Sequence, residues 1–173
     1  MRLTALTTSL ALTATVSAAA DVIETDQMVV YEGQWVQSKI PEQNGALMFL
    51  TVPRGQNGEY FTISCVKKGD QMDRDVRLGF PEPVAGKDDV PVSLIIDGQT
   101  HAAMAKPVGT TPDPTFTKSD IHRYEVVFDD DAKESGFLGA MKAGNELTIA
   151  GQTIPVDLKG FTAALNGQAK YCK

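Results

Sequence analysis

Pro91-Val92-Ser93-Leu94-Ile95-Ile96-Asp97-Gly98-Gln99-Thr100-His101-Ala102-Ala103-Met104-Ala105 places two apolar runs on either side of the dipeptide Asp97-Gly98. Aspartate followed by glycine favours a type I′ turn, because both central residues of that turn need a positive φ angle. The pattern therefore predicts an antiparallel β-hairpin with strands at residues 91–96 and 99–105, and a positive φ at Gly98.

Similar short runs recur along the chain, separated by turn-forming residues such as Asn44-Gly45 and Lys68-Gly69-Asp70. A second hairpin is predicted around Ala150-Gly151, between residues 147–149 and 153–156. Further strands are expected at residues 35–40, 46–52, 60–67, 75–80 and 122–128. Short strands at this spacing are typical of mainly β proteins, so we expect an antiparallel β-sandwich or a partly open barrel.

Two regions interrupt the strands. Residues 106–120 are rich in proline, threonine and aspartate, and we interpret them as a solvated loop or, alternatively, a partner-binding loop. A short helix is predicted at residues 132–143, with Asp131 as its N-cap and Glu134 completing a capping box. Its apolar stripe, which includes Phe137 and Met141, is expected to face the core.

A second short helix is predicted at residues 160–171, with Phe161, Leu165 and Cys172 on one face. In the strand at residues 60–67, alternation places Phe61, Ile63 and Cys65 on one side. Both cysteines thus lie on the apolar side of their own elements. We therefore predict a structural disulfide between Cys65 and Cys172 that holds the C-terminal helix against the sheet, whereas free or intermolecular thiols are the alternative.

The first twenty residues have the features of a secretory signal peptide. Arg2 provides a positive start, a mildly apolar stretch follows, and small residues end at Ala18, Ala19 or Ala20, each a possible cleavage site. We expect residues 1–20 to be removed and residues 21–173 to form a single β-rich domain. The expected location is periplasmic or secreted.

Composition limits the partners that this domain can have. The net charge is −6 over 173 residues, and removal of Arg2 leaves 15 basic against 22 acidic residues, a net charge of −7. An acidic protein is a poor match for nucleic acid or for an anionic membrane surface. Apart from the first twenty positions, the chain has no run of 18 apolar residues, so no transmembrane segment is expected in the mature chain.

Motifs that carry catalytic or metal chemistry are weak in this sequence. The two histidines, His101 and His122, lie near no recognisable nucleophile motif. His101 and Met104 could suggest copper, but residues three apart in a strand face opposite ways. The run Asp129-Asp130-Asp131 lacks the alternating ligands and closing glutamate of a calcium loop. We expect no catalytic residue, metal or cofactor, although a catalytic pair among the 22 acidic residues stays open.

A family resemblance comes from the C-terminal third. Leu158-Lys159-Gly160-Phe161-Thr162-Ala163-Ala164-Leu165, followed by Cys172, resembles the closing motif of the invasion-associated locus B family and related small exported bacterial envelope proteins. Trp35, Cys65 and Ile95-Ile96-Asp97-Gly98 also lie at matching places, and the resemblance loosely covers residues 35–172. The family's usual cysteine shortly after the tryptophan is missing here.

The resemblance implies an exported, non-enzymatic, β-rich envelope protein with a binding or accessory role, in some members linked to host-cell association. The alternative is a small secreted inhibitor or a hydrolase that acts on envelope polymers. The expected partner is a protein or another envelope component.

Overall fold

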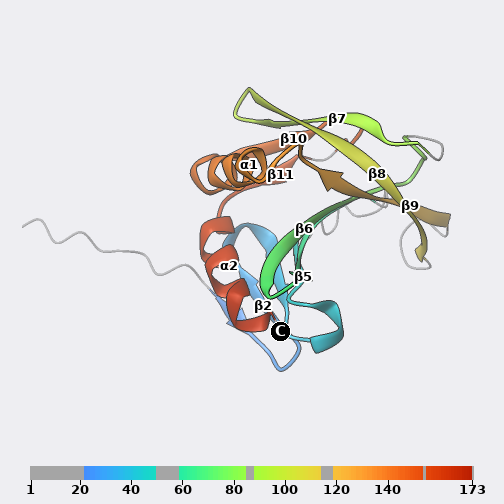
Figure 1. Cartoon of the computed structure of the whole chain (residues 1–173). Helices are drawn as coiled ribbons and strands as arrows, with labels where there is room; N and C mark the ends of the chain where they lie inside the picture. The colour runs from blue at the N-terminus through green and yellow to red at the C-terminus, as the bar shows by residue number, and fades with distance from the viewer. Residues whose placement is uncertain (1–21, 50–58, 85–87, 114–118, 154, 173) are drawn as a thin grey trace, which may run out of the picture.

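The computed structural model describes residues 22–49, 59–84, 88–113, 119–153 and 155–172. All strands in these ranges belong to one antiparallel sheet with the order β1-β2-β3-β4-β5-β6-β9-β8-β7-β10-β11 (Figure 1). The strands are β1 (Ile23–Glu24), β2 (Met28–Tyr31), β3 (Trp35–Ser38), β4 (Leu47–Phe49), β5 (Tyr60–Lys68), β6 (Gln71–Phe80), β7 (Val90–Ile96), β8 (Gln99–Asp113), β9 (Ser119–Val127), β10 (Glu146–Ile149) and β11 (Val156–Asp157).

Two helices complete the fold, α1 (Asp131–Ala143) and α2 (Phe161–Gln168), and short 3₁₀ turns lie at Glu32–Gln34, Pro41–Gln43 and Ala169–Tyr171. The expected mainly β class with a C-terminal helix on the sheet is confirmed. In the described ranges, neither helix is long and apolar enough to cross a bilayer. The predicted signal peptide lies outside the described residues.

The hairpin predicted at Asp97-Gly98 is confirmed. Asp97 has a φ of 47° and Gly98 a φ of 86°, as a type I′ turn requires. Ile96 pairs with Gln99 next to the turn, and the ladder continues to Val90 opposite Ala105. Local turn chemistry therefore fixes the register of β7 and β8.

The loop predicted at residues 106–120 is wrong over most of its length. β8 continues to Asp113 and pairs with β9 as far as Ser119, with a register shift between Pro107 and Gly109. β7 pairs with β8 only up to Ala105, so the remainder of β8 has one unpaired side among the described strands. Proline is compatible with such an edge, because a missing N–H there breaks no ladder bond.

Two local predictions are corrected by one or a few residues. The second hairpin exists, but its returning strand β11 consists of Val156 and Asp157 in the described chain and begins later than Thr153. The N-cap of α1 is Asp130 and not Asp131, since the Asp130 side chain accepts a hydrogen bond from Lys133 N at 2.7 Å. Glu134 is therefore not part of the predicted capping box.

The core lies inside the curved sheet and is closed by the two helices. Trp35 is fully buried and contacts Phe49, Phe61 and Phe161, with ring centroids 4.8 Å from Phe161. Its indole Nε1 donates a 2.9 Å hydrogen bond to the carbonyl oxygen of Asp157 in β11. Strands from opposite ends of the sheet order thus meet, which corresponds to the partly open barrel among the two expected architectures.

The Asp97 carboxylate also joins the hairpin tip to the segment between α1 and β10. It accepts hydrogen bonds from Asn145 N at 2.9 Å, from Asn145 Nδ2 at 3.1 Å and from Glu146 N at 3.1 Å. These donors favour the ionised carboxylate, the backbone N–H of Asn145 most of all, and so they lower the pKa of Asp97.

Asp97→Asn should reduce the acid sensitivity of the fold. A folded-state pKa below the unfolded value means that the stabilisation is present above the unfolded pKa, near 3.9, and is lost as the pH falls through the folded one. The free energy of unfolding of wild-type protein should therefore decline more between pH 6 and pH 2 than that of Asp97→Asn. Asparagine tolerates the positive φ, so parallel pH curves would contradict the role of the charge.

Candidate binding site

A hollow of about 430 Å³ lies between β8 and α1. This volume falls within the range of about 300–1,000 Å³ that is usual for ligand sites. Its walls come from the start of β8, from Phe128 after β9, and from one side of α1. The lining residues are Gln99, Thr100, His101, Ala102, Phe128, Lys133, Gly136 and Ala140.

Small residues on α1 keep this hollow open. Lys133, Gly136 and Ala140 are spaced three and four residues apart, so they lie on the same side of the helix. A Cβ added at Gly136 would meet no atom within 4 Å. Glycine inside a helix lowers the stability of the helix by about 1 kcal/mol relative to alanine. At Gly136, the missing side chain leaves space for the hollow.

His101 forms one wall of the hollow. Its ring packs edge-on against Phe137 with centroids 5.6 Å apart, and its Nε2 is buried without a hydrogen-bond partner among the described residues. Lys133 lies on the opposite side and pairs with Asp129, and this hydrogen bond raises the pKa of Lys133. The hollow thus offers the Lys133 ammonium group beside the rings of His101 and Phe128.

The residues that line the hollow include no aspartate, glutamate, serine or cysteine that could orient or complement His101. Burial alternates along β8. His101, Ala103 and Ala105 share the face of the strand that is turned to the core, and Met104 lies on the opposite face. In the described part of the chain, no group of three potential ligands is arranged to hold a metal ion.

The run Asp129-Asp130-Asp131 serves the start of α1. Asp130 caps the helix, Asp129 pairs with Lys133, and Asp131 lies in the first turn. Aspartates at these positions compensate the positive end of the helix dipole. Their structural role thus accounts for the residues that a calcium site would have used.

A second, smaller and more acidic cleft lies where β6 and β9 meet the first turns of α1. Asp75, Glu125 and Asp131 line it together with Arg74. The Asp75 side chain is only 6% exposed, and its Oδ2 pairs with Arg77 at 2.6 Å, whereas its Oδ1 has no hydrogen-bond partner among the described residues. Asp75 is not among the residues predicted from the sequence to form a site, although strand alternation places it on the same face of β6 as Arg77.

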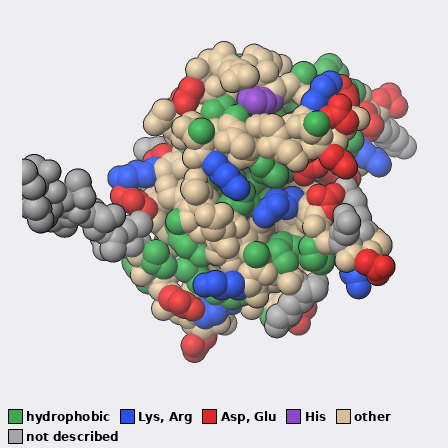
Figure 2. Space-filling model, turned by 60° about the vertical axis from the view of Figure 1, so that its left-hand side comes forward, with side chains coloured by type: hydrophobic (Ala, Val, Ile, Leu, Met, Phe, Trp, Pro, Cys, Tyr) green, Lys and Arg blue, Asp and Glu red, His purple; other side chains and the backbone are tan. Residues whose placement is uncertain are grey.

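The outward face of the central strands carries further polar residues. Tyr60 lies over Gly79, where a Cβ would overlap the tyrosine ring, and burial raises the pKa of Tyr60 to about 12. Charges of both signs are interspersed with hydrophobic patches on the face shown in Figure 2.

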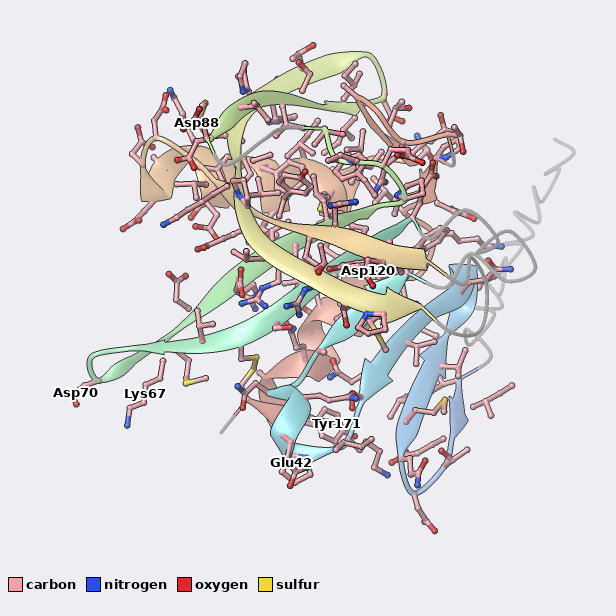
Figure 3. The ribbon with its side chains drawn as sticks, turned by 90° about the vertical axis from the view of Figure 1, so that its right-hand side faces the viewer. Glu42, Lys67, Asp70, Asp88, Asp120 and Tyr171 are labelled. Carbon is pink, nitrogen blue, oxygen red and sulfur yellow. A yellow bond between two sulfur atoms is a disulfide. The ribbon has the colours of Figure 1, made fainter. Side chains whose placement is uncertain are left out.

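The predicted disulfide between Cys65 and Cys172 is present, with Cα atoms 5.5 Å apart. Phe61, Ile63 and Cys65 are buried on one side of β5, as the alternation predicted. Figure 3 shows Tyr171, next to the second cysteine, beside the segment that carries Glu42. The Gln168 side chain supports this junction, because its amide donates to the carbonyl oxygens of Gly45 and Ile63, each at 2.9 Å.

Comparison with known proteins gives no relative for this chain. No protein-family model matches it, and neither a curated protein nor a solved structure is significantly similar.

Proposed function

We propose that this chain is an exported, non-enzymatic binding or accessory protein of a bacterial envelope, and that the hollow between β8 and α1 is its binding site. The observation that carries the proposal is the hollow itself, whose lining brings Lys133 of α1 opposite the start of β8. Such a site presents a charged group and hydrogen-bonding side chains to a ligand.

Two further observations support export. A disulfide between residues 107 positions apart is typical of proteins that fold in an oxidising compartment. The first twenty residues have the pattern of a signal peptide. The resemblance to the invasion-associated locus B family, in the segment that forms α2, adds the proposal of an envelope role in host-cell association.

Gly136→Leu should weaken retention of the protein on immobilised bacterial envelope extract by at least about tenfold, equivalent to 1.4 kcal/mol. Leucine at this position would occupy the hollow, which nothing else fills. Gly139→Leu is the matched control, because it also replaces an unobstructed glycine of α1 but does not line the hollow. Equal retention of both variants and wild type would argue against this site.

Export is tested separately. Full-length chain expressed in a bacterial host should appear in the periplasmic or extracellular fraction with its thiols protected from alkylation. A version that lacks residues 2–20 should stay in the cytoplasm. Cytoplasmic retention of the full-length chain would contradict the proposed location.

The alternative, a hydrolase that acts on envelope polymers, is favoured by one observation, the buried Asp75 beside Glu125 in the acidic cleft. Purified protein should show no release of soluble fragments from peptidoglycan or envelope polysaccharide. If fragments are released and Asp75→Asn abolishes the release while Asp70→Asn at the exposed β5–β6 turn does not, the alternative replaces the main proposal.

A further inference from the structure

One side of the first part of β8 has no strand beside it among the described residues. Residues 99–103 pair with β7 on one side, but on the other side the ladder with β9 begins only at Met104, opposite Val127. Figure 1 shows β8 continuing past the arrowhead of β9 toward the hairpin tip. β9 ends opposite Met104, and the described chain then turns into α1. The position beside residues 99–103, where β9 would have continued, is therefore left without a strand.

The register identifies the backbone groups that point into this vacant place. A two-residue turn makes Ile96 and Gln99 a hydrogen-bonded pair, and bonded pairs then alternate with non-bonded ones along the hairpin. Thr100 and Ala102 fall at non-bonded positions, so their N–H and C=O groups point away from β7. Two observations on β7 agree with this alternation of hydrogen-bonded and non-bonded pairs.

Ser93, opposite Ala102, turns its carbonyl away from β8, where it accepts a hydrogen bond from Ala150 N at 3.1 Å. Pro91, opposite Met104, has no N–H to give and therefore fits a non-bonded position.

The hollow meets β8 along this unpaired edge. Side chains of consecutive strand residues point to opposite faces, so a cavity lined by four consecutive residues, 99 to 102, contacts the strand edge-on and not from one face. On the other side, Gly136 and Ala140 leave the surface of α1 flat. The arrangement is a strand edge and a helix with an open channel between them.

The residues of this edge lack the sequence features that protect many exposed edges, and α1 lies across the hollow from it. Natural sheets shield their edges with charged residues, prolines or bulges, since an unprotected edge pairs readily with another strand. Residues 99–103 include no charge and no proline, and the register shift of β8 occurs only after Pro107. An edge that is left open next to a formed hollow is suited to an incoming strand.

We propose that the ligand is an extended polypeptide segment of a partner protein, which adds to β8 at Thr100 and Ala102 beyond the end of β9 and directs a carboxylate side chain to Lys133. This inference rests on the proposed binding function and names its ligand class. Charge complementarity selects the carboxylate, because Lys133 is the only formally charged residue among those that line the hollow in the described chain. Displacing the exposed Asp129 from Lys133 costs little.

The probe is the heptapeptide acetyl-Thr-Val-Thr-Glu-Thr-Val-Thr-amide, added to the oxidised mature protein and followed by NMR. We expect binding to slow amide exchange at Thr100 and Ala102 by tenfold or more. Amides of His101 and Ala103, which already pair with β7, should change little. Replacing glutamate by lysine in the peptide should weaken binding at least about tenfold.

Backbone modification and protein variants separate strand addition from other modes of binding. Peptides N-methylated at alternate residues, prepared in both phases, should differ, because only one phase removes the N–H groups that face β8. Gly136→Leu should prevent peptide binding and Gly139→Leu should not. Equal binding of both N-methylated series, or no alternation of protection along residues 99–103, would overturn the inference.

Two outcomes distinguish this inference from the broader function. If no peptide binds while retention on envelope extract still depends on Gly136, the hollow is a binding site for another ligand class and only the strand-addition inference fails. If sedimentation shows a dimer of this chain in which Thr100 and Ala102 are protected without peptide, the edge belongs to a second copy, and the inference is also overturned.

Discussion

Replacing Gly33 by alanine is expected to lower the free energy of unfolding by about 3–5 kcal/mol, the range of large, mechanism-specific losses. Gly33 lies between β2 and β3 with a φ of 78°, and a Cβ there would overlap the carbonyl oxygen of Lys159. The obstacle is backbone, which cannot rotate away as a side chain can. Urea unfolding of the purified variant, or its failure to accumulate as folded protein, measures the effect.

Gly69→Ala is the matched control for this substitution. Gly69 also has a positive φ, 62°, but a Cβ there would meet nothing within 4 Å. Alanine at Gly69 should therefore cost only the conformational penalty, about 1–2 kcal/mol. Equal losses for the two variants would mean that the close backbone approach at Gly33 does not matter.

The contact at Gly33 is one half of a reciprocal closure. Gly160, with a φ of 77°, approaches the carbonyl oxygen of Glu32 in the same way that Gly33 approaches Lys159. The side chains of Glu32 and Lys159 also form an ion pair at 2.6 Å. Two turns at opposite ends of the sheet order thus lie backbone to backbone, and the absence of a Cβ on each side permits it.

The turns and the buried faces of strands and helices can be predicted from the sequence, because they depend on residues that are close together in the chain. Asp97-Gly98 identifies its turn because the backbone angles of that turn restrict which residues can occupy it. Alternation in β5 identifies the buried side of the strand, and helical spacing identifies Phe161 and Leu165 as core residues. Each of these signals is contained within about ten residues of sequence.

Contacts between segments that are far apart in the chain could not be predicted from the sequence. Residues 106–113 were expected to form a loop because of their prolines, but the missing neighbour on one side of β8 is a property of the whole sheet. The Asp97 carboxylate contacts residues 48 and 49 positions away, and the hollow arises from where β9 stops relative to β8. No local pattern encodes these relations.

Reduction of the Cys65–Cys172 disulfide is the second change with a large expected effect. The bond closes a loop of 107 positions, and loops of about 100 residues correspond to about 4.7 kcal/mol in the chain-entropy model. We expect a measured loss of about 2–5 kcal/mol on urea unfolding with and without a phosphine reductant. Reduction leaves all side-chain atoms in place, so the comparison is free of the cavity that a substitution would create.

The loss should be unevenly distributed along the C-terminal segment. Phe161 and Leu165 remain buried without the bond, and the two hydrogen bonds of the Gln168 amide still fix the end of α2 to Gly45 and Ile63. Beyond Gln168, the 3₁₀ turn Ala169–Tyr171 has no buried residue. Hydrogen exchange should therefore accelerate most at residues 169–172, less within α2, and least in the sheet.

Equal protection of residues 160–172 with and without reductant, or two accessible thiols in the native oxidised protein, would contradict the structural role of the bond. Gln168→Ala supplies the complementary test, because it removes the buried amide and leaves the disulfide intact. If the bond and the amide both hold α2, reduction of Gln168→Ala should release the whole helix, and exchange should then accelerate as far back as Phe161. The combined effect should exceed the sum of the separate ones, because each constraint keeps the partners of the other in place.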